Sequence, residues 1–300
     1  MAFEIAPVAA LLPWWSQSAS AVQAEAGSRG GKSPRREEPE WAQRWRNLGK
    51  KETAEITRRN IHGLMRAAHL YDEDHGSLPP SVIANPELPG GKRLSGLVLL
   101  LPYLNAESWI NEGKPCFDAE TVKLGRELYE MIVQTKAWDD PANLQAAKTL
   151  MPAFLAPQSA PFRDRDGIAV SHFAFVQGSL NDFDGAFPGE SGVKISDIKD
   201  GTVATLGFGQ VVNDTGPWIA EGLSTARQVY AKTATSPGAF GSQFQSGCFF
   251  AMCDSSPFFH RTDAAADVVL QQAATRSGGE FLNNMEITRQ SLPFEFDEPR

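Results

Sequence analysis

One amphipathic segment, residues 52–74, constrains the fold of this chain more than any other feature of its sequence. Apolar side chains recur there every three or four residues, which places them on one face of an α-helix: Ile61, Leu64, Met65, Ala68 and Tyr71. Gly76 is suited to a left-handed C-terminal cap, and Pro79 with Pro80 prevents the helix from continuing. A helix with one apolar stripe must bury it, so the rest of the chain has to supply a cover.

The second half of the chain is predicted to supply that cover as β-strands. Short apolar runs separated by Gly and Asp are typical of strands, and they occur at residues 169–177, 193–195, 203–208 and 248–252. Two further helices are predicted at residues 121–136 and 263–276, whereas residues 97–101 fit a helix or a strand. Helices first and strands later indicate an α+β fold, because parallel-sheet proteins alternate the two. We expect the long N-terminal helix to pack on an antiparallel sheet, with inserted helices and loops.

The chain is expected to divide into an N-terminal tail or linker (residues 1–50), an α+β domain (residues 51–283) and a C-terminal tail (residues 284–300). Residues 16–50 are rich in Ser, Ala, Gly, Arg and Glu without a sustained period, as in linkers. Trp41 and Trp45 lie four residues apart, hence on one helical face, which predicts a short helix docked on the body or on a membrane surface.

The first residues bear on localisation. Residues 5–15 are apolar, but they are about half as long as a membrane-spanning helix and contain Pro7 and Pro13. With the small residues at 22–24 they weakly imitate a secretory signal peptide, although no Lys or Arg precedes them. We expect the cell envelope, periplasmic or extracellular, with the cytoplasm as the alternative. The sequence leaves open whether residues 1–24 are cleaved, anchored or retained.

Charge is distributed unevenly along the chain. The formal net charge is −8, yet residues 29–59 hold ten Lys and Arg against five Glu, so the remainder carries about −13. An acidic body argues against nucleic acid as a partner. The basic stretch can contact anionic lipid, as a peripheral membrane contact of residues 1–50, or an acidic neighbour. Glu37, Glu38 and Glu40 are interleaved with it, which favours a solvated segment.

The three cysteines do not settle the redox compartment. Cys248 and Cys253 are five residues apart in a predicted strand, so their side chains point to opposite faces and do not easily form a disulfide. Cys116 can pair with either one in an oxidising compartment, or all three remain free thiols.

Catalytic and metal-binding patterns are weak. The five histidines lack the i, i+4 spacing of two metal ligands on one helix, and no Cys-x-x-Cys or Gly-x-Ser-x-Gly pattern occurs. We therefore predict no enzymatic activity and no cofactor. A Ser or Cys beside His172 or His260 in space would instead indicate a hydrolase. Asp-Gly turns are weak candidates for a calcium site, with Asp182 and Asp184 first, although Asp-Gly is also ordinary turn chemistry.

Aromatic residues supply the candidate interaction surface. The chain has eighteen phenylalanines, and in alternating strands some of those near residue 250 are expected to face outward. Core packing is the alternative for each of them. The predicted interaction residues are Phe244, Phe249, Phe258, Phe259, Trp41 and Trp45.

Several short blocks occur in a recognisable order between residues 55 and 282. They are Asn60-Ile61-His62-Gly63-Leu64, His75-Gly76-Ser77-Leu78-Pro79-Pro80, residues 99–104, residues 138–143, Asp197-Ile198-Lys199-Asp200-Gly201-Thr202 and residues 273–280. Together they resemble a planctomycete-type prepilin-like family, a domain of unknown function named for an H-X9-DG motif. The family positions matched here include His75, Pro79, Pro80, Asp200, Gly201 and Asp254. The resemblance implies a pilin-like head.

Two departures separate the chain from this family. In the naming motif Phe244 stands in place of His and Ser255 in place of Gly, so that Asp254 alone is kept. The usual processing site followed by a long apolar N-terminal helix is missing, and pilus cores are built from such helices. The resemblance therefore implies the fold more strongly than the assembly.

The sequence thus predicts a noncatalytic structural or interaction protein of the cell envelope. It would be pseudopilin-like and would assemble with or dock on other protein subunits, as a homo- or hetero-oligomer. A periplasmic solute- or glycan-binding protein that uses aromatic stacking is the first alternative. A hydrolase with dispersed catalytic residues is the second.

Overall fold

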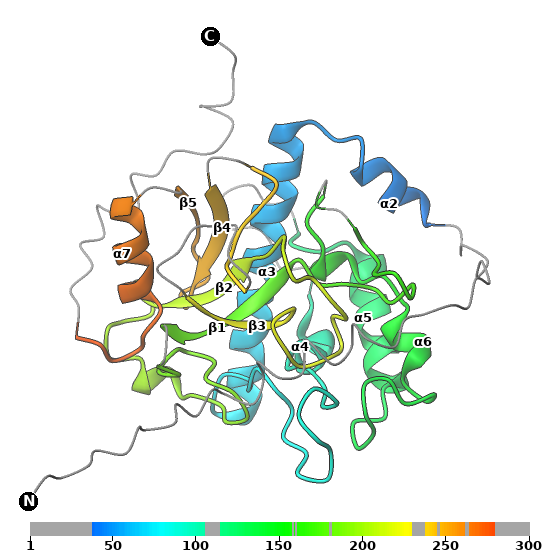
Figure 1. Ribbon diagram of the computed structural model, residues 1–300, viewed down its shortest axis with the longest axis horizontal. Coiled ribbons are helices and arrows are strands. Elements are labelled where there is room, and N and C mark those ends of the chain that lie inside the picture. Colours follow the sequence, from blue (N-terminus) through cyan, green and yellow to red (C-terminus); the bar gives the residue numbers. More distant parts are fainter. Residues whose placement is uncertain are drawn as a thin grey trace, which may run out of the picture. The chain divides into compact units, whose positions relative to one another are not determined.

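A computed structural model describes residues 38–105, 115–157, 159, 161–179, 182–229, 238–244, 247–261 and 264–279. Residues 39–300 form one compact unit and residues 1–38 another, so the account below concerns the first of these (Figure 1). Of the predicted N-terminal tail, residues 1–50, the structure describes residues 38–50, and the predicted C-terminal tail, residues 284–300, lies outside the described residues.

The long helix predicted from residues 52–74 is confirmed as α3, Lys50–His75. Its first turn is closed by Glu52, whose carboxylate accepts the Gly49 N–H at 3.2 Å. Gly76 ends the helix as predicted, with φ at 74° and its N–H donated to the carbonyl of Asp72 at 2.7 Å. Only glycine adopts this left-handed conformation without steric cost, so the end of α3 is encoded locally.

A five-stranded sheet follows in the second half of the chain (Figure 1). In spatial order the strands are β3 (Ala226–Val229), β1 (Phe173–Ser179), β2 (Leu206–Gln210), β4 (Gly247–Met252) and β5 (Pro257–Arg261). Three pairings are antiparallel, whereas β1 and β3 are parallel, so the sheet is mixed and the expectation of an antiparallel sheet is wrong at this edge. The reason is the connection after β2, which carries the chain past β1 to its far side. The α+β class is confirmed.

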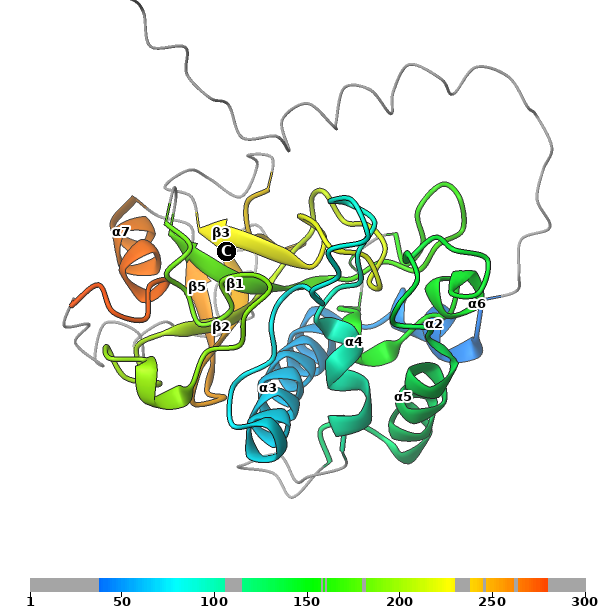
Figure 2. The same ribbon diagram turned by 90° about the horizontal axis from the view of Figure 1, so that it is seen from below.

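The sheet is covered on both faces. Helix α3 packs on β2, β4 and β5, and helix α7 (Ala264–Ala273) packs on β1 and β5. Alternation along β1 divides its side chains: Phe173 and Phe175 join the core around α3, while Ala174 and Val176 join the core around α7. Figure 2 shows the strands between the two helices. The sequence predicted a helix at residues 263–276, and this helix is α7.

The remaining helices are short. They are α2 (Glu40–Trp45), α4 (Leu97–Leu100), η1 (Leu101–Tyr103), α5 (Ala119–Met131), α6 (Leu144–Ala147), η2 (Pro152–Phe154) and η3 (Ile195–Asp197). Residues 97–101, which the sequence left undecided, are therefore helical. Three of these short helices, α4, η1 and η2, pack on α3. The strand predicted at residues 193–195 is wrong, because Val193 makes a single backbone bond to Leu78 and Ile195 begins a 3-10 turn.

Helix α5 ends five residues earlier than its predicted limit at residue 136 because of Asn143. The Asn143 amide donates to the carbonyls of Val133 at 3.1 Å and Ala137 at 2.9 Å, and its oxygen accepts the Val133 N–H at 2.8 Å. Residues 133–137 are therefore folded around this buried amide. The periodicity of apolar residues that predicts a helix does not reveal hydrogen bonds between Asn143 and residues before it in a loop.

All three cysteines are buried and none is bridged to another. Burial raises the pKa of the Cys248 and Cys253 thiols. Within the described ranges, no helix combines the length and the apolar character needed to cross a membrane.

Candidate functional site

Two histidines of α3 hold the turn between β4 and β5. The ring Nδ1 of His62 lies 2.7 Å from the carbonyl oxygen of Ser255, and Nε2 of His69 lies 2.7 Å from that of Cys253. His62 is buried, and burial lowers its pKa. Both rings thus act as struts between α3 and the sheet.

The turn that these histidines hold contains Asp254 and Ser255, the two residues that the sequence analysis matched to the Asp-Gly of the H-X9-DG motif. Asp254 accepts hydrogen bonds from the N–H of Ser256 at 2.8 Å and from its hydroxyl at 2.5 Å. Ser255 has φ at 73°, a left-handed conformation, at the position where the resembled family has Gly. Its hydroxyl is also buried and has no hydrogen-bond partner.

We therefore expect Ser255→Gly to stabilise the protein by about 1–2 kcal/mol. The substitution removes the steric cost of a left-handed Ser and a buried unsatisfied hydroxyl, which together outweigh the added flexibility of the unfolded chain. Ser256→Gly is the matched control, and it should destabilise because it only loses the contact with Asp254. Urea unfolding measures both, and an unfolding midpoint for Ser255→Gly at or below that of the wild type would contradict the expectation.

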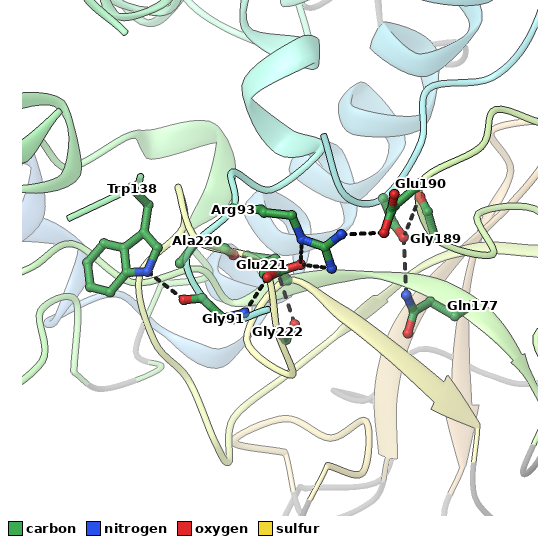
Figure 3. A network of polar contacts seen from close by, with 11 residues as sticks. Gly91, Arg93, Trp138, Gln177, Gly189, Glu190, Ala220, Glu221 and Gly222 are labelled. Carbon is green, nitrogen blue, oxygen red and sulfur yellow. Dashed lines mark hydrogen bonds and ion pairs between the residues drawn. The ribbon is translucent and has the colours of Figure 1, made fainter. Parts of the chain in front are cut away.

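An ionic network ties three loops together beside the sheet (Figure 3). Arg93 donates from Nε to Glu221 at 2.8 Å and pairs through its other nitrogens with Glu221 at 2.7 Å and with Glu190. The second oxygen of Glu221 accepts the N–H of Gly91. Burial lowers the pKa of Arg93, but the bonds to the two carboxylates outweigh it and raise the pKa. Since the side chains of Arg93 and Glu221 are only 16% and 6% exposed, the main role of this network is to connect the loops to one another.

Trp138 extends the same network of loop contacts. Its indole N–H donates to the carbonyl of Gly91 at 2.9 Å, and its backbone N–H donates to Lys92 at 3.0 Å (Figure 3). The Lys92 ammonium lies 6.0 Å from the centre of the indole ring and pairs with Asp139. The block at residues 138–143 thus places its side chains inside the protein's own loop contacts.

The predicted calcium candidates lie in a second network of polar contacts between distant segments. Asp184 pairs with Arg276 at 2.8 Å through one oxygen and accepts the Ser277 hydroxyl at 2.6 Å through the other. A cation at Asp184 would have to displace both partners. Asp182 contributes its backbone carbonyl to Gln228 at 3.2 Å. No group of three or more His, Cys, Asp or Glu side chains suited to a metal occurs among the residues described, and calcium binding stays a prediction.

Asp200 and Gly201, which the sequence analysis matched to the resembled family, take part in this second network. The Asp200 carboxylate accepts the backbone N–H groups of Gly278 at 2.8 Å and Gly279 at 3.0 Å. Gly201 follows with φ at 90°. The block around Asp200 and the block that follows α7, 78 residues later, are therefore in direct contact.

The phenylalanines predicted as an interaction surface are mostly internal. Phe244, Phe249 and Phe259 form one buried cluster with Ala54 of α3, with ring centres 5.0 to 6.2 Å apart. Phe258 is partly exposed and stacks on Phe250 at 5.7 Å. The geometry of these rings is that of core packing, the alternative that the sequence left open.

The two tryptophans predicted for interaction lie on α2. Trp41 meets Trp45 edge-on at 5.1 Å and lies 6.5 Å from the ring of Phe162. Trp45 is buried and Trp41 packs against the main core while partly exposed. Both rings thus dock α2 on the body of residues 39–300, one of the two surfaces that the sequence proposed for them.

An exposed aromatic cluster lies at the C-terminal end of α3. The rings of Tyr71 and His75 stack at 3.9 Å with an interplanar angle of 5°, and Tyr103 from η1 meets them edge-on at 5.6 and 6.2 Å. The Tyr103 hydroxyl donates to Asp74 at 3.0 Å. We name this surface the α3-end patch, and its members are Tyr71, Asp72, Glu73, Asp74, His75, Tyr103 and Tyr129.

The electrostatics of the α3-end patch are those of neutral rings beside carboxylates. Burial, the hydrogen bond to Asp74 and the charge of Asp74 raise the pKa of Tyr103 to about 12. Burial, followed by the proximity of Tyr129 of α5, also raises the pKa of Tyr71. Both phenols therefore remain protonated donors at neutral pH. Glu73, Asp74 and His75 are exposed and the three tyrosines are partly exposed, so the patch is accessible.

The sequence analysis did not find the α3-end patch as a site. Three of the four tyrosines in the chain meet there, but they come from three elements that are far apart in the sequence. Tyr71 and His75 are four residues apart, and this i, i+4 pair on one helical face was the only signal available from the sequence.

Comparisons of the chain with protein-family models, with curated proteins and with solved structures produced no match. The resemblance to prepilin-like proteins therefore stays a prediction, and the case for a function rests on the geometry above.

Proposed function

We propose that this chain is a noncatalytic interaction protein of the cell envelope, with a prepilin-like head that docks on partner subunits through the α3-end patch. The observation that carries the proposal is the accessible group of Tyr71, His75 and Tyr103, with the carboxylate of Asp74 hydrogen-bonded to Tyr103. Aromatic rings with polar edges are enriched at protein interfaces, because they bury a large apolar area while keeping a hydrogen-bonding tip. Tyr103 also packs against the main core, but all three rings keep part of their surface accessible, which leaves them available to a partner.

The family assignment within this proposal is supported by what the matched blocks do. Gly76 caps α3, Asp200 binds the backbone after α7, and Ser255 adopts the conformation that suits the Gly of the H-X9-DG motif. Each block thus has a structural reason to exist in this fold. The envelope location remains part of the proposal.

The contacts of His172, His62 and His69 favour a noncatalytic role for these three histidines. His172 is fully buried, and burial lowers its pKa to about 4. One ring nitrogen of His172 accepts the N–H of Ala156 at 3.1 Å and the other lies 3.1 Å from the carbonyl of Pro161. Both nitrogens are thus bonded to the backbone, as is one nitrogen each of His62 and His69. A catalytic base needs an accessible nitrogen facing the substrate, which His172 does not offer.

A glycan-binding protein is the second candidate, because the same patch offers rings on which a sugar can stack. Tyr71 and His75 present a flat, partly exposed surface flanked by carboxylates, a combination that also suits sugar hydroxyls. By contrast, a hollow of about 290 Å³ along α5 has no aromatic ring in its lining on which a sugar could stack: Ala119, Val122, Lys123, Arg126, Glu127 and Glu130.

The two candidates differ in what is isolated with the full chain from its native source. We expect the wild-type protein to elute as a stoichiometric complex with protein subunits, and the double variant Tyr71→Ala, His75→Ala to elute without them. Lys123→Ala with Glu127→Ala, an exposed pair on α5, is the matched control and should keep the complex. Light scattering gives the mass of each species, and thermal unfolding verifies that the variants fold.

Two results would count against the proposal. A wild-type monomer that carries a bound oligosaccharide would favour the glycan-binding alternative. A complex of the same mass and composition in the wild type and the patch variant would remove the α3-end patch from the interaction.

A further inference from the structure

We propose that the occupant of the α3-end patch is the basic segment at residues 29–36 of a second copy of this chain, so that copies associate head to tail. This inference rests on the proposed function and names the partner of the same surface. Residues 29–36 contain Arg29, Lys32, Arg35 and Arg36 and no acidic residue. The last turn of α3 offers the complementary charge in Asp72, Glu73 and Asp74, and Asp74 is hydrogen-bonded to Tyr103.

The side chains of the patch suit Arg and Lys in two ways at once. An Arg guanidinium forms charge-assisted hydrogen bonds with carboxylates, and it also stacks on the face of a tyrosine ring. In the patch the carboxylate of Asp74 and the ring of Tyr103 are held together by a hydrogen bond of 3.0 Å, so a guanidinium can meet both. A purely acidic surface would attract any cation, whereas adjoining rings and carboxylates favour Arg.

The charge of the chain points to the same pairing. Residues 29–59 carry a net charge of about +5 while the remainder carries about −13, so one copy presents both signs in separate regions. Two copies can therefore attract each other with the basic segment of one against the acidic body of the other.

The reach of the segment favours a second copy over its own patch. Helix α3 has 26 residues and is thus about 39 Å long. Figure 1 shows α2 joined to the beginning of α3, far from the end that bears the patch. Arg36 is three residues and Arg29 ten residues from Pro39, which allows at most about 11 Å and about 36 Å of extended chain, both shorter than α3.

The symmetry of this contact follows from its two different surfaces. Each copy contributes one segment and one patch, so the interface is heterologous, and repeated association gives rings or open chains. Because most of the attraction is between exposed charges, association should weaken as salt is added.

Complementary charge reversals in the full chain test this arrangement. The segment variant carries Arg29→Glu, Lys32→Glu, Arg35→Glu and Arg36→Glu, and the patch variant carries Asp72→Lys, Glu73→Lys and Asp74→Lys. The patch lysines lie in the last turn of α3, where cations favour the helix, so folding should be retained. We expect the wild type to self-associate at low ionic strength, and each variant alone to do so at least about tenfold more weakly.

Mixing the two variants provides the decisive measurement. The basic segment of the patch variant can then bind the acidic patch of the segment variant. The acidic segment of the segment variant can likewise bind the basic patch of the patch variant. In analytical ultracentrifugation the mixture should therefore regain the oligomers seen for the wild type. Arg165→Glu with Lys199→Glu, exposed charges elsewhere on the protein, is the control and should associate like the wild type. Thermal unfolding of each variant confirms folding.

The outcomes separate this inference from the proposed function. A mixture that stays monomeric, or a wild type that is monomeric at low ionic strength, would overturn the head-to-tail contact. If the protein from its native source still formed a patch-dependent complex, the proposed function would stand with a different partner. If that complex were independent of the patch, both proposals would fail.

Discussion

Replacement of Arg227 by Met is expected to lower the free energy of unfolding by about 3–5 kcal/mol. The Arg227 side chain is fully buried in β3, the edge strand of the sheet. It donates to the carbonyls of Ala239 at 2.5 Å and Asn213 at 2.5 Å, and also to those of Leu223 and Asp214. Met has a similar length but no donor, so four backbone carbonyls, one of them fully buried, would lose this partner at once.

Urea unfolding of the full chain measures this loss. Arg165→Met is the matched control, because Arg165 is exposed in a loop, and its effect should be within about 0.5 kcal/mol. Arg227→Lys should recover only part of the stability, since an ammonium cannot reach carbonyls in several directions at once. A loss below about 1 kcal/mol in Arg227→Met would show that water replaces the guanidinium, contrary to the expectation.

The second large effect is expected for Gly96→Ala, with a loss of at least about 3 kcal/mol. A Cβ atom at Gly96 would lie 1.9 Å from the carbonyl oxygen of Pro80. Gly96 also donates its N–H to Ser81 at 2.8 Å, so the two backbone segments cannot separate without breaking this bond. The close approach joins the Pro79-Pro80 exit of α3 to the beginning of α4.

The control for this substitution is Gly49→Ala. There the nearest atom to an added Cβ is the carboxylate of Glu52 at 3.8 Å, an ordinary contact, and the loss should stay below about 1 kcal/mol. Thermal unfolding compares the two variants. Equal midpoints for Gly96→Ala and Gly49→Ala would mean that the Pro80 segment moves freely, against the tight contact described here.

The parts of the fold that were predictable are those encoded by neighbouring residues. The periodicity of its apolar residues and the glycine that ends it predicted helix α3. A short apolar run predicted strand β4. Strand β3 was missed because its sequence, Ala-Arg-Gln-Val, reads as polar, and Arg227 can be buried because the loops before and after β3 supply its acceptors. Strand β5 was also missed, although its phenylalanines had been noted.

Site residues were harder to predict than elements for the same reason. The Asp-Gly turns suggested a cation at Asp184, but Arg276 arrives there from the other end of the domain. The phenylalanines near residue 250 suggested a surface, but α3 covers them through Ala54. The α3-end patch needs three elements to meet, and a sequence pattern cannot report such a meeting. Local rules find helices and turns, whereas sites depend on the tertiary arrangement.

The struts from α3 to the β4–β5 turn have a consequence for biosynthesis. His62 and His69 contact residues 193 and 184 positions later in the chain, so a ribosome completes α3 long before their acceptors exist. At about 5–20 residues per second, this delay lasts on the order of 10–40 s. During that time the apolar stripe of the nascent helix has no sheet to cover it, and the growing polypeptide presents a binding stretch to chaperones until its last strands emerge.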